Sequence, residues 1–138
     1  MKQRPMGILV LAVSLALLAG AATVADASAA PATSKPVLSA IPRKDRPFRV
    51  SGFVTPKSTA ASRVKVKIIL WMATGDGGYG VMDTYWAKVG VRAGGKPGSG
   101  YSLTLTIPMK GDHGVQAVQY RSGKKVSSSR TTYFTVQP

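Results

Sequence analysis

Apolar residues recur at every second position along most of this chain after residue 36, and this alternation limits what the chain can fold into. In the clearest segment, residues 63–71, apolar side chains alternate with Lys65 and Lys67 on the opposite face. Successive side chains of a β-strand point to opposite faces, so this spacing is typical of a strand with one buried face. Gly or Pro interrupts the periodic segments too often for a helix. The sequence therefore predicts an all-β fold.

Turn residues divide the alternating part of the chain into seven predicted strands. Glycine-rich turns are expected at 74–80 and 93–100, and a polar turn at 109–114. Seven short antiparallel strands separated by turns match an immunoglobulin-like sandwich of two sheets. A small closed barrel is the alternative. The predicted strands cover residues 37–41, 48–54, 63–71, 81–92, 101–107, 115–120 and 127–136.

The inward-facing apolar side chains of these strands form one predicted core. Each large apolar side chain that is fully buried contributes roughly 1.5–3 kcal/mol, which is enough in sum for one marginally stable domain. The predicted core consists of Phe48, Val50, Val54, Val64, Val66, Ile68, Leu70, Val89, Leu103, Leu105, Ile107, Val118, Phe134 and Val136.

The first 29 residues carry a targeting signal. Lys2 and Arg4 form a short basic head before an uncharged stretch, residues 6–25, whose centre is strongly apolar. Small residues at 25–29 fit the pattern that a signal peptidase requires. The sequence therefore predicts a signal peptide helix over residues 1–29. A retained membrane anchor is the alternative, because the uncharged stretch approaches the roughly 20 residues that span a bilayer.

This prediction divides the chain into three parts. Cleavage is expected between Ala27 and Ala30, followed by a linker over residues 30–35 and the sandwich domain over residues 36–138. We expect a secreted, extracellular protein without stable membrane insertion after cleavage. Because no cysteine is available to carry a lipid, any association with the cell surface is expected to be non-covalent.

The residue inventory argues against most site chemistries. The 138 residues include no cysteine, one histidine (His113), and five acidic residues that are all aspartate. Zinc clusters, thiol nucleophiles, disulfide frameworks and paired-carboxylate machinery need residues that this chain barely supplies. Asp76 and Asp83 flank a turn, but calcium takes six or more oxygens, and the adjacent Asp112 and His113 are expected in a turn. We expect no enzyme, no catalytic residues, no cofactor and no metal.

Positive charge is the strongest functional signal. The chain has 19 Lys and Arg against five Asp, a formal charge of +14. Such an excess predicts attraction to polyanions by Coulomb forces and counterion release. The candidate residues on solvent-facing strand positions are Lys65, Lys67, Lys88 and Arg92. In the alternative interpretation these cations only keep the strands soluble and prevent edge pairing. Specific nucleic-acid recognition is not expected, since no recognition helix is present.

Aromatic residues on one predicted hairpin form a second candidate feature. Trp71, Tyr79, Tyr85 and Trp86 lie on either side of the 74–80 turn. Exposed rings there could stack on sugars, whereas buried rings would pack across the strands. Because Trp71 shares the face of the lysines, it is expected to be the more exposed tryptophan. Trp71 and Tyr79 are therefore the candidates for shape-dependent contact with a glycan.

Six segments carry a family resemblance that spans residues 36–136. They are Phe48–Lys57, Val64–Ile68, Tyr85–Val89, Ser99–Leu105, Gly114–Tyr120 and Phe134–Val136. Together they resemble the bacterial immunoglobulin-like repeat of exported proteins from actinobacteria and other soil bacteria. The resemblance implies the sandwich fold and a role as a spacer or adhesive module. The family usually occurs in tandem, whereas this sequence has one module, and its 74–80 turn is longer than the family's hairpin.

These features together predict a non-catalytic, secreted binding or adhesion module. Its basic face would attach to an anionic cell-envelope polymer, a polysaccharide or another secreted protein. Two alternatives belong to other classes. One is a structural spacer or partner subunit without a ligand, and the other is a protein inhibitor that acts through the 74–80 loop.

Overall fold

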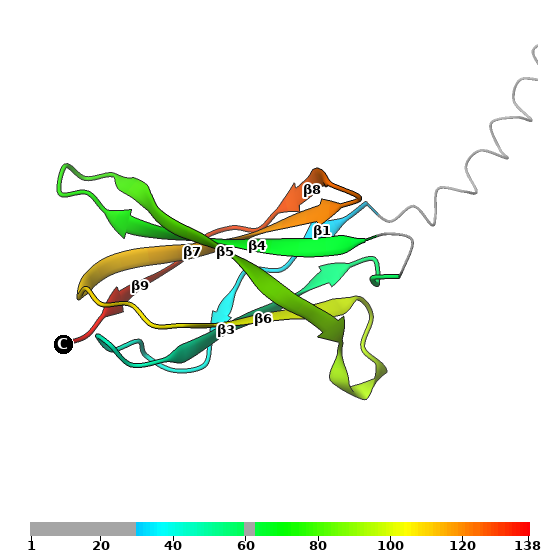
Figure 1. Cartoon of the computed structure of the whole chain (residues 1–138), viewed down its shortest axis with the longest axis horizontal. Helices are drawn as coiled ribbons and strands as arrows, with labels where there is room; N and C mark the ends of the chain where they lie inside the picture. Colours follow the sequence, from blue (N-terminus) through cyan, green and yellow to red (C-terminus); the bar gives the residue numbers. More distant parts are fainter. Residues whose placement is uncertain (1–29, 60–62) are drawn as a thin grey trace, which may run out of the picture. The chain divides into compact units, whose positions relative to one another are not determined.

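The computed structural model describes residues 30–59 and 63–138, and its regular secondary structure is almost entirely β-strand (Figure 1). The all-β prediction is therefore confirmed for this part of the chain. The predicted signal peptide over residues 1–29 lies outside the described residues. The strands are β1 (Ala32–Thr33), β2 (Val37–Leu38), β3 (Phe48–Thr55), β4 (Val64–Ala73), β5 (Tyr79–Val91), β6 (Ser99–Leu105), β7 (Gly111–Arg121), β8 (Lys124–Ser128) and β9 (Thr132–Val136), with a short 3₁₀ turn at Ala93–Gly95.

All pairings between these named strands are antiparallel, and they form one continuous curled sheet. The hydrogen-bonded order is β1-β3-β6-β5-β4-β7-β8, with β2 beside β3 and β9 beside β7. The long strand β5 makes the curl possible. Its first part, Tyr79–Ala87, pairs with β4, whereas Lys88–Val91 pairs with β6. One strand thus connects the β3/β6 side of the molecule to the β4/β7 side.

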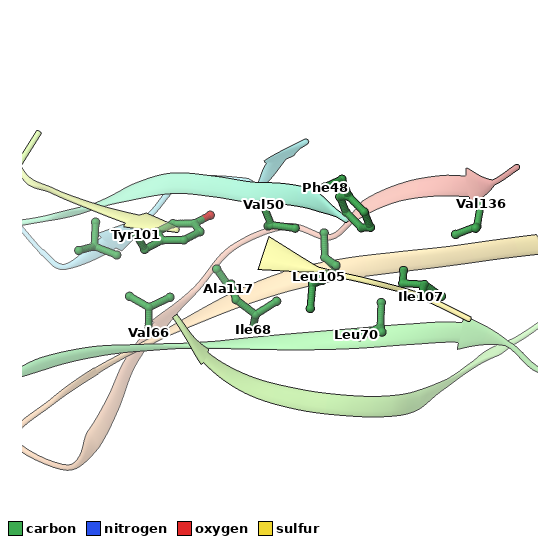
Figure 2. Close-up of a cluster of buried hydrophobic side chains, with 12 residues drawn as sticks. Phe48, Val50, Val66, Ile68, Leu70, Tyr101, Leu105, Ile107, Ala117 and Val136 are labelled. Carbon is green, nitrogen blue, oxygen red and sulfur yellow. The ribbon is translucent and has the colours of Figure 1, made fainter. Parts of the chain in front are cut away.

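The core fills the space between these two sides. Figure 2 shows Val50 and Phe48 of β3 pointing toward Ile68 and Leu70 of β4. Ten of the predicted core residues are buried, namely Phe48, Val50, Val54, Val66, Ile68, Leu70, Leu105, Ile107, Val118 and Val136. The other four are partly buried against the core: Val64, Val89, Leu103 and Phe134. The period-two pattern thus identified most of the core.

Among the buried hydrophobic residues of the described part of the chain, three were not in the predicted core: Tyr101, Val115 and Ala117. Tyr101 is 2 % exposed although it carries a hydroxyl group. That hydroxyl donates a hydrogen bond to the backbone carbonyl of Ser34 at 2.8 Å, which satisfies the polar end of a buried ring. Val115 and Ala117 lie in the predicted strand 115–120, but the prediction chose Val118, which is on the other face of that strand and pairs with Lys67. The strand β7 also begins at Gly111, within the segment predicted as a turn, and is longer than expected.

Two predicted segments are also organised differently in the structure. Part of the predicted linker, residues 30–35, forms β1, in which Ala32 pairs with Thr55. The predicted last strand, residues 127–136, is divided into β8 and β9. Ser129 causes this division, because its hydroxyl accepts a hydrogen bond from the Ala117 amide at 2.9 Å in place of a regular ladder bond. The described residues therefore form nine strands, where seven were predicted.

Candidate functional site

Two lysines and two aromatic rings meet on the outer face of β4, β5 and β7. The register places Lys67 opposite Trp86, and Lys65 opposite Tyr120. The ammonium groups of Lys65 and Lys67 lie 5.4 and 5.3 Å from the Trp86 ring centroid. Lys67 also lies 5.3 Å from the Tyr120 ring, and the two rings meet edge to face at 5.6 Å. We call these four residues the Trp86 cluster.

The Trp86 cluster keeps much of its surface open to solvent. Trp86 is 54 % exposed even though two lysines and Tyr120 lie against it. Cation–π attraction of about 0.5–1 kcal/mol at such exposed sites favours ammonium positions near the ring. The cluster therefore presents a half-exposed indole with two positive charges over its ring. This arrangement suits a ligand that has both an apolar face and negative charge.

A groove of about 680 Å³ lies on the outer face of the β3/β6 side. Its floor lacks side chains where Gly90 of β5 pairs with Gly100 of β6. We call it the glycine groove, and its charged residues are Arg49, Lys88, Arg92 and Lys96. The two predicted site residues Lys88 and Arg92 therefore line the same concave surface.

Arg92 is held in place within the glycine groove by two contacts. Its Nη1 atom donates a hydrogen bond to the Pro97 carbonyl at 2.8 Å. Its guanidinium carbon lies 4.0 Å from the centroid of the Phe53 ring. A planar guanidinium stacks well on an aromatic face, so Arg92 loses less side-chain entropy on binding an anion than a free arginine would.

The Trp86 cluster and the glycine groove adjoin one another. A smaller hollow of about 360 Å³ is lined by Arg49, Trp86 and Lys88 together. Trp86 and Lys88 are two positions apart on β5 and are both exposed, as expected for residues on one strand face. The predicted cations Lys65, Lys67, Lys88 and Arg92 therefore belong to one extended surface. Arg49 and Lys96, which sequence reasoning did not select, add to the same surface.

The negative charges of the described residues lie elsewhere. Within residues 30–59 and 63–138, the ion pair within 4.0 Å is the exposed Lys44–Asp45 contact. Asp83 accepts a hydrogen bond from the Thr84 amide at 2.8 Å, and Asp112 accepts one from the Thr135 hydroxyl at 2.7 Å. The cations of the extended surface therefore have no carboxylate partner among the described residues.

Asp76 stabilises the turn between β4 and β5. Its carboxylate accepts hydrogen bonds from the Thr74 hydroxyl and from the Gly78 amide, the latter at 3.0 Å. These hydrogen bonds hold the pKa of Asp76 below its ordinary value, and the bond from Thr74 has the largest effect. Gly75 and Gly77 have φ angles of 90° and 95°, which L-residues rarely adopt. The prediction of a glycine-dependent turn is confirmed for residues 74–78, whereas Tyr79 and Gly80 belong to β5.

Trp71 and Tyr79 do not join the Trp86 cluster. Trp71 lies four residues beyond Lys67 on β4, about 13 Å along the strand. Its side chain is half-buried with a buried Nε1 atom, so the expectation that Trp71 is the more exposed tryptophan is wrong. Tyr79 is 39 % exposed, and its ring lies 5.1 Å from that of Tyr133. These aromatic residues form a separate patch at the far end of the sheet.

Alternation along β5 places Trp86 on the same face as Lys88, but a β-bulge determines that Trp86 lies opposite Lys67. The register between β4 and β5 shifts by one residue between Leu70 and Trp71. With an unbroken register from the turn, Lys67 would lie opposite Tyr85, whereas the bulge places Trp86 there. A one-residue shift exchanges the two faces of a strand. The alternation of residues alone cannot reveal such a bulge.

Metal-ligand clusters and membrane-spanning helices are both absent from the described residues. Within residues 30–59 and 63–138, no group of three or more His, Cys, Asp or Glu side chains could hold a metal ion. Over the same part of the chain, no helix has the length and hydropathy needed to cross a membrane.

Comparison with known proteins gives structural neighbours but no family. No protein-family model matches the chain, and no curated protein matches it. Among solved structures, the chain is similar to a variant of the superoxide reductase (neelaredoxin) from Ignicoccus hospitalis, at 16 % identity and a TM-score of 0.46 over 80 % of this chain and 85 % of that one. A second structure of superoxide reductase from Ignicoccus hospitalis matches at 16 % identity and a TM-score of 0.45 over 76 % and 82 %.

These neighbours correct the functional classification made from the sequence. Both are named as enzymes, so they contradict the expectation of a non-catalytic binding or adhesion module, together with its spacer, partner-subunit and inhibitor alternatives. We therefore no longer classify the chain as non-catalytic. A TM-score below 0.5 at 16 % identity assigns neither an activity nor a fold family, and we transfer none to this chain.

Proposed function

We propose that this protein binds an acidic polysaccharide, such as an anionic polymer of a cell envelope, on the surface formed by the Trp86 cluster and the glycine groove. The observation that carries the proposal is the position of the Lys65 and Lys67 ammonium groups beside the half-exposed Trp86 ring. A sugar ring has an apolar C–H face that packs on an indole, and its acidic substituents attract the lysines. The proposal concerns binding and makes no statement about catalysis.

The surroundings of the Trp86 cluster support a polymer as the ligand. The cations extend from Lys65 on β4 to Arg92 after β5. They can therefore bind several negative charges of one polysaccharide molecule at the same time. Screened Coulomb attraction is weak for each exposed pair but accumulates over a repeating polyanion. Sulfated, carboxylated and phosphate-bearing glycans share this chemistry.

An immunoglobulin-like sandwich remains our proposal for the finer architecture. In the immunoglobulin fold, strands A, B, E and D form one sheet, and strands C, F and G form the other. The β3–β6 and β4–β7 pairs fit B–E and C–F, while the two parts of β5 fit an edge strand of each sheet. This order also supports the resemblance to the bacterial immunoglobulin-like repeat. In a closed barrel the backbones of β1 and β8 would pair, whereas the contact there includes a hydrogen bond between the Thr33 and Ser127 hydroxyl groups at 2.7 Å.

Export of the protein is part of the same proposal, because an envelope polymer lies outside the cytoplasm. Its support is the basic head, apolar stretch and small residues of positions 1–29. Mass spectrometry of the protein recovered from culture medium tests it. A mature N-terminus between residues 28 and 30 would support export, whereas an intact Met1 would contradict it.

The binding proposal is tested with a pair of charge-matched double variants. We expect Lys65→Gln/Lys67→Gln to weaken binding to heparin or polygalacturonate about tenfold, since exposed charge pairs contribute up to about 1 kcal/mol each and a factor of ten corresponds to about 1.4 kcal/mol. The control, Lys110→Gln/Arg130→Gln, removes the same charge from exposed positions outside the β4/β5 surface. Isothermal titration calorimetry at two salt concentrations measures both. Equal losses in the two variants would contradict a defined site and indicate nonspecific attraction.

A further inference from the structure

We propose that the glycine groove is a subsite for one acidic sugar unit, whose carboxylate or sulfate is bound by Arg92. This inference rests on the proposed binding of an acidic polysaccharide and assigns the recognition of the charged unit to a separate part of the surface. The volume of about 680 Å³ lies within the range of small-molecule sites. A single monosaccharide with its substituent fits in such a space.

The floor of the groove is bare backbone, because two paired residues there are glycines. Gly90 and Gly100 are directly paired neighbours on β5 and β6. A Cβ atom placed on Gly90 would meet no other atom within 4 Å, and one on Gly100 would meet Arg92 Cγ at 3.6 Å. Glycine weakens a strand interior, and its presence there often marks a place where a ligand approaches the backbone closely. Neither glycine has a positive φ angle, so backbone conformation does not explain them.

The walls of the groove supply charge without neutralising partners. Arg49, Lys88, Arg92 and Lys96 line it, and no acidic side chain is among the described residues around it. Arg92 is fixed by the Pro97 carbonyl and the Phe53 ring, which leaves further N–H donors of its guanidinium for an anion. The planar guanidinium presents parallel N–H donors that form paired hydrogen bonds with a carboxylate or a sulfate. Arg92 is therefore the residue that binds the anionic group.

The position of the groove agrees with a polymer that continues beyond it. The smaller hollow lined by Arg49, Trp86 and Lys88 connects the groove to the Trp86 cluster. One acidic unit in the groove would place the next units of the chain toward the indole. Ser51 and Ser102 also line the groove and offer hydroxyl groups for the sugar.

The first test fills the groove without changing its charge. Gly90→Val adds a side chain into open space at a position with an ordinary strand conformation, so the fold should be kept or slightly stabilised. We expect at least a tenfold loss of affinity for trigalacturonate, measured by calorimetry. Ser128→Val, an exposed position on β8, is the matched control and should bind as the wild type does. The methyl ester of trigalacturonate, which has no charge, should bind weakly to all three proteins.

A second pair of variants tests Arg92 and keeps the inference falsifiable if Gly90→Val does not fold. Arg92→Gln should weaken binding of trigalacturonate at least tenfold, and Phe53→Leu should weaken it less, because it frees the guanidinium but keeps its charge. The affinity for a sulfated heparin disaccharide is measured in the same way, and its comparison with trigalacturonate shows whether the groove prefers sulfate or carboxylate. Wild-type affinity in Gly90→Val and Arg92→Gln would overturn the subsite, even if Lys65→Gln/Lys67→Gln still abolished binding and so upheld the polymer proposal. Failure of the wild type to bind either probe would overturn the subsite as well.

Discussion

The side-chain amide of Gln119 donates a hydrogen bond to the backbone carbonyl of Ala32 at a distance of 3.0 Å. Gln119 is fully buried on β7, and Ala32 belongs to β1 at the other end of the sheet path. The Gln119 Oε1 atom accepts a second bond from Arg121 Nε at 2.6 Å. One buried polar side chain therefore ties the N-terminal strand to the central strand β7.

Substitution of Gln119 by leucine tests this tie. We expect Gln119→Leu to lower the free energy of unfolding by about 1–3 kcal/mol, because the Ala32 carbonyl and Arg121 Nε lose their partner. Urea denaturation followed by circular dichroism measures the change. Gln116→Leu is the control, since Gln116 is half-buried where Gln119 is fully buried, and water can replace its bond to the Ser129 carbonyl. A Gln119→Leu protein as stable as the wild type would contradict a structural role for β1.

A pair of glycine substitutions tests the packing around Tyr101. A Cβ atom at Gly52 would lie 2.3 Å from the Tyr101 hydroxyl oxygen, whereas one at Gly90 would meet nothing within 4 Å. We therefore expect Gly52→Ala to destabilise the protein by at least about 1–3 kcal/mol through overpacking. Gly90→Ala should leave stability unchanged or raise it slightly. Thermal melts of the two variants compare them directly, and equal melting temperatures would contradict this packing.

Tyr101 also makes the stability of the protein sensitive to alkaline pH. Burial raises the pKa of Tyr101 from 10.0 to about 12, against a smaller opposite effect of the Ser34 side-chain hydroxyl. Because the folded state holds this proton more tightly than the unfolded state, the contribution is complete below pH 10 and is lost as the pH rises toward 12. Urea melts at pH 8, 10 and 11 should show falling stability.

The Tyr101→Phe variant isolates that contribution. It lacks the ionisable group, so its stability should fall less steeply between pH 10 and 12 than that of the wild type. At pH 8 it should be less stable by about 1 kcal/mol, because the Ser34 carbonyl loses its hydrogen bond. Identical pH profiles for the two proteins would show that Tyr101 does not control the alkaline loss.

Period-two alternation predicts the strands and most of the core because one face of each strand is buried. Val66, Ile68 and Leu70 follow this pattern on β4, and all three are buried. Alternation fails where a tertiary contact decides the structure. Ala32 joins the sheet through its pairing with Thr55, which lies 23 positions along the chain. No local pattern near residue 32 indicates that pairing.

The candidate surface was predicted in part for the same reason. Lys65 and Lys67 were selected correctly as outward-facing because they alternate with buried residues on β4. The ring beside them depends on the bulge between Leu70 and Trp71, which places Trp86 opposite Lys67. Arg49 and Lys96 join through the folding of β3 and of the 93–98 turn toward β5, which is a property of the tertiary structure.

The two tryptophans offer the sharpest separation of stability from binding. Trp71 is half-buried, so Trp71→Ala should lower the free energy of unfolding by about 2 kcal/mol or more and change polysaccharide affinity little. Trp86 is 54 % exposed beside Lys65 and Lys67, so Trp86→Ala should change stability by less than about 1 kcal/mol. It should, however, weaken binding to polygalacturonate about tenfold. Urea melts and calorimetric titration of both variants measure the two effects. If Trp71→Ala weakened binding and Trp86→Ala did not, the ligand would lie at the far end of the sheet, on Trp71 and Tyr79. That result would contradict the binding surface proposed above.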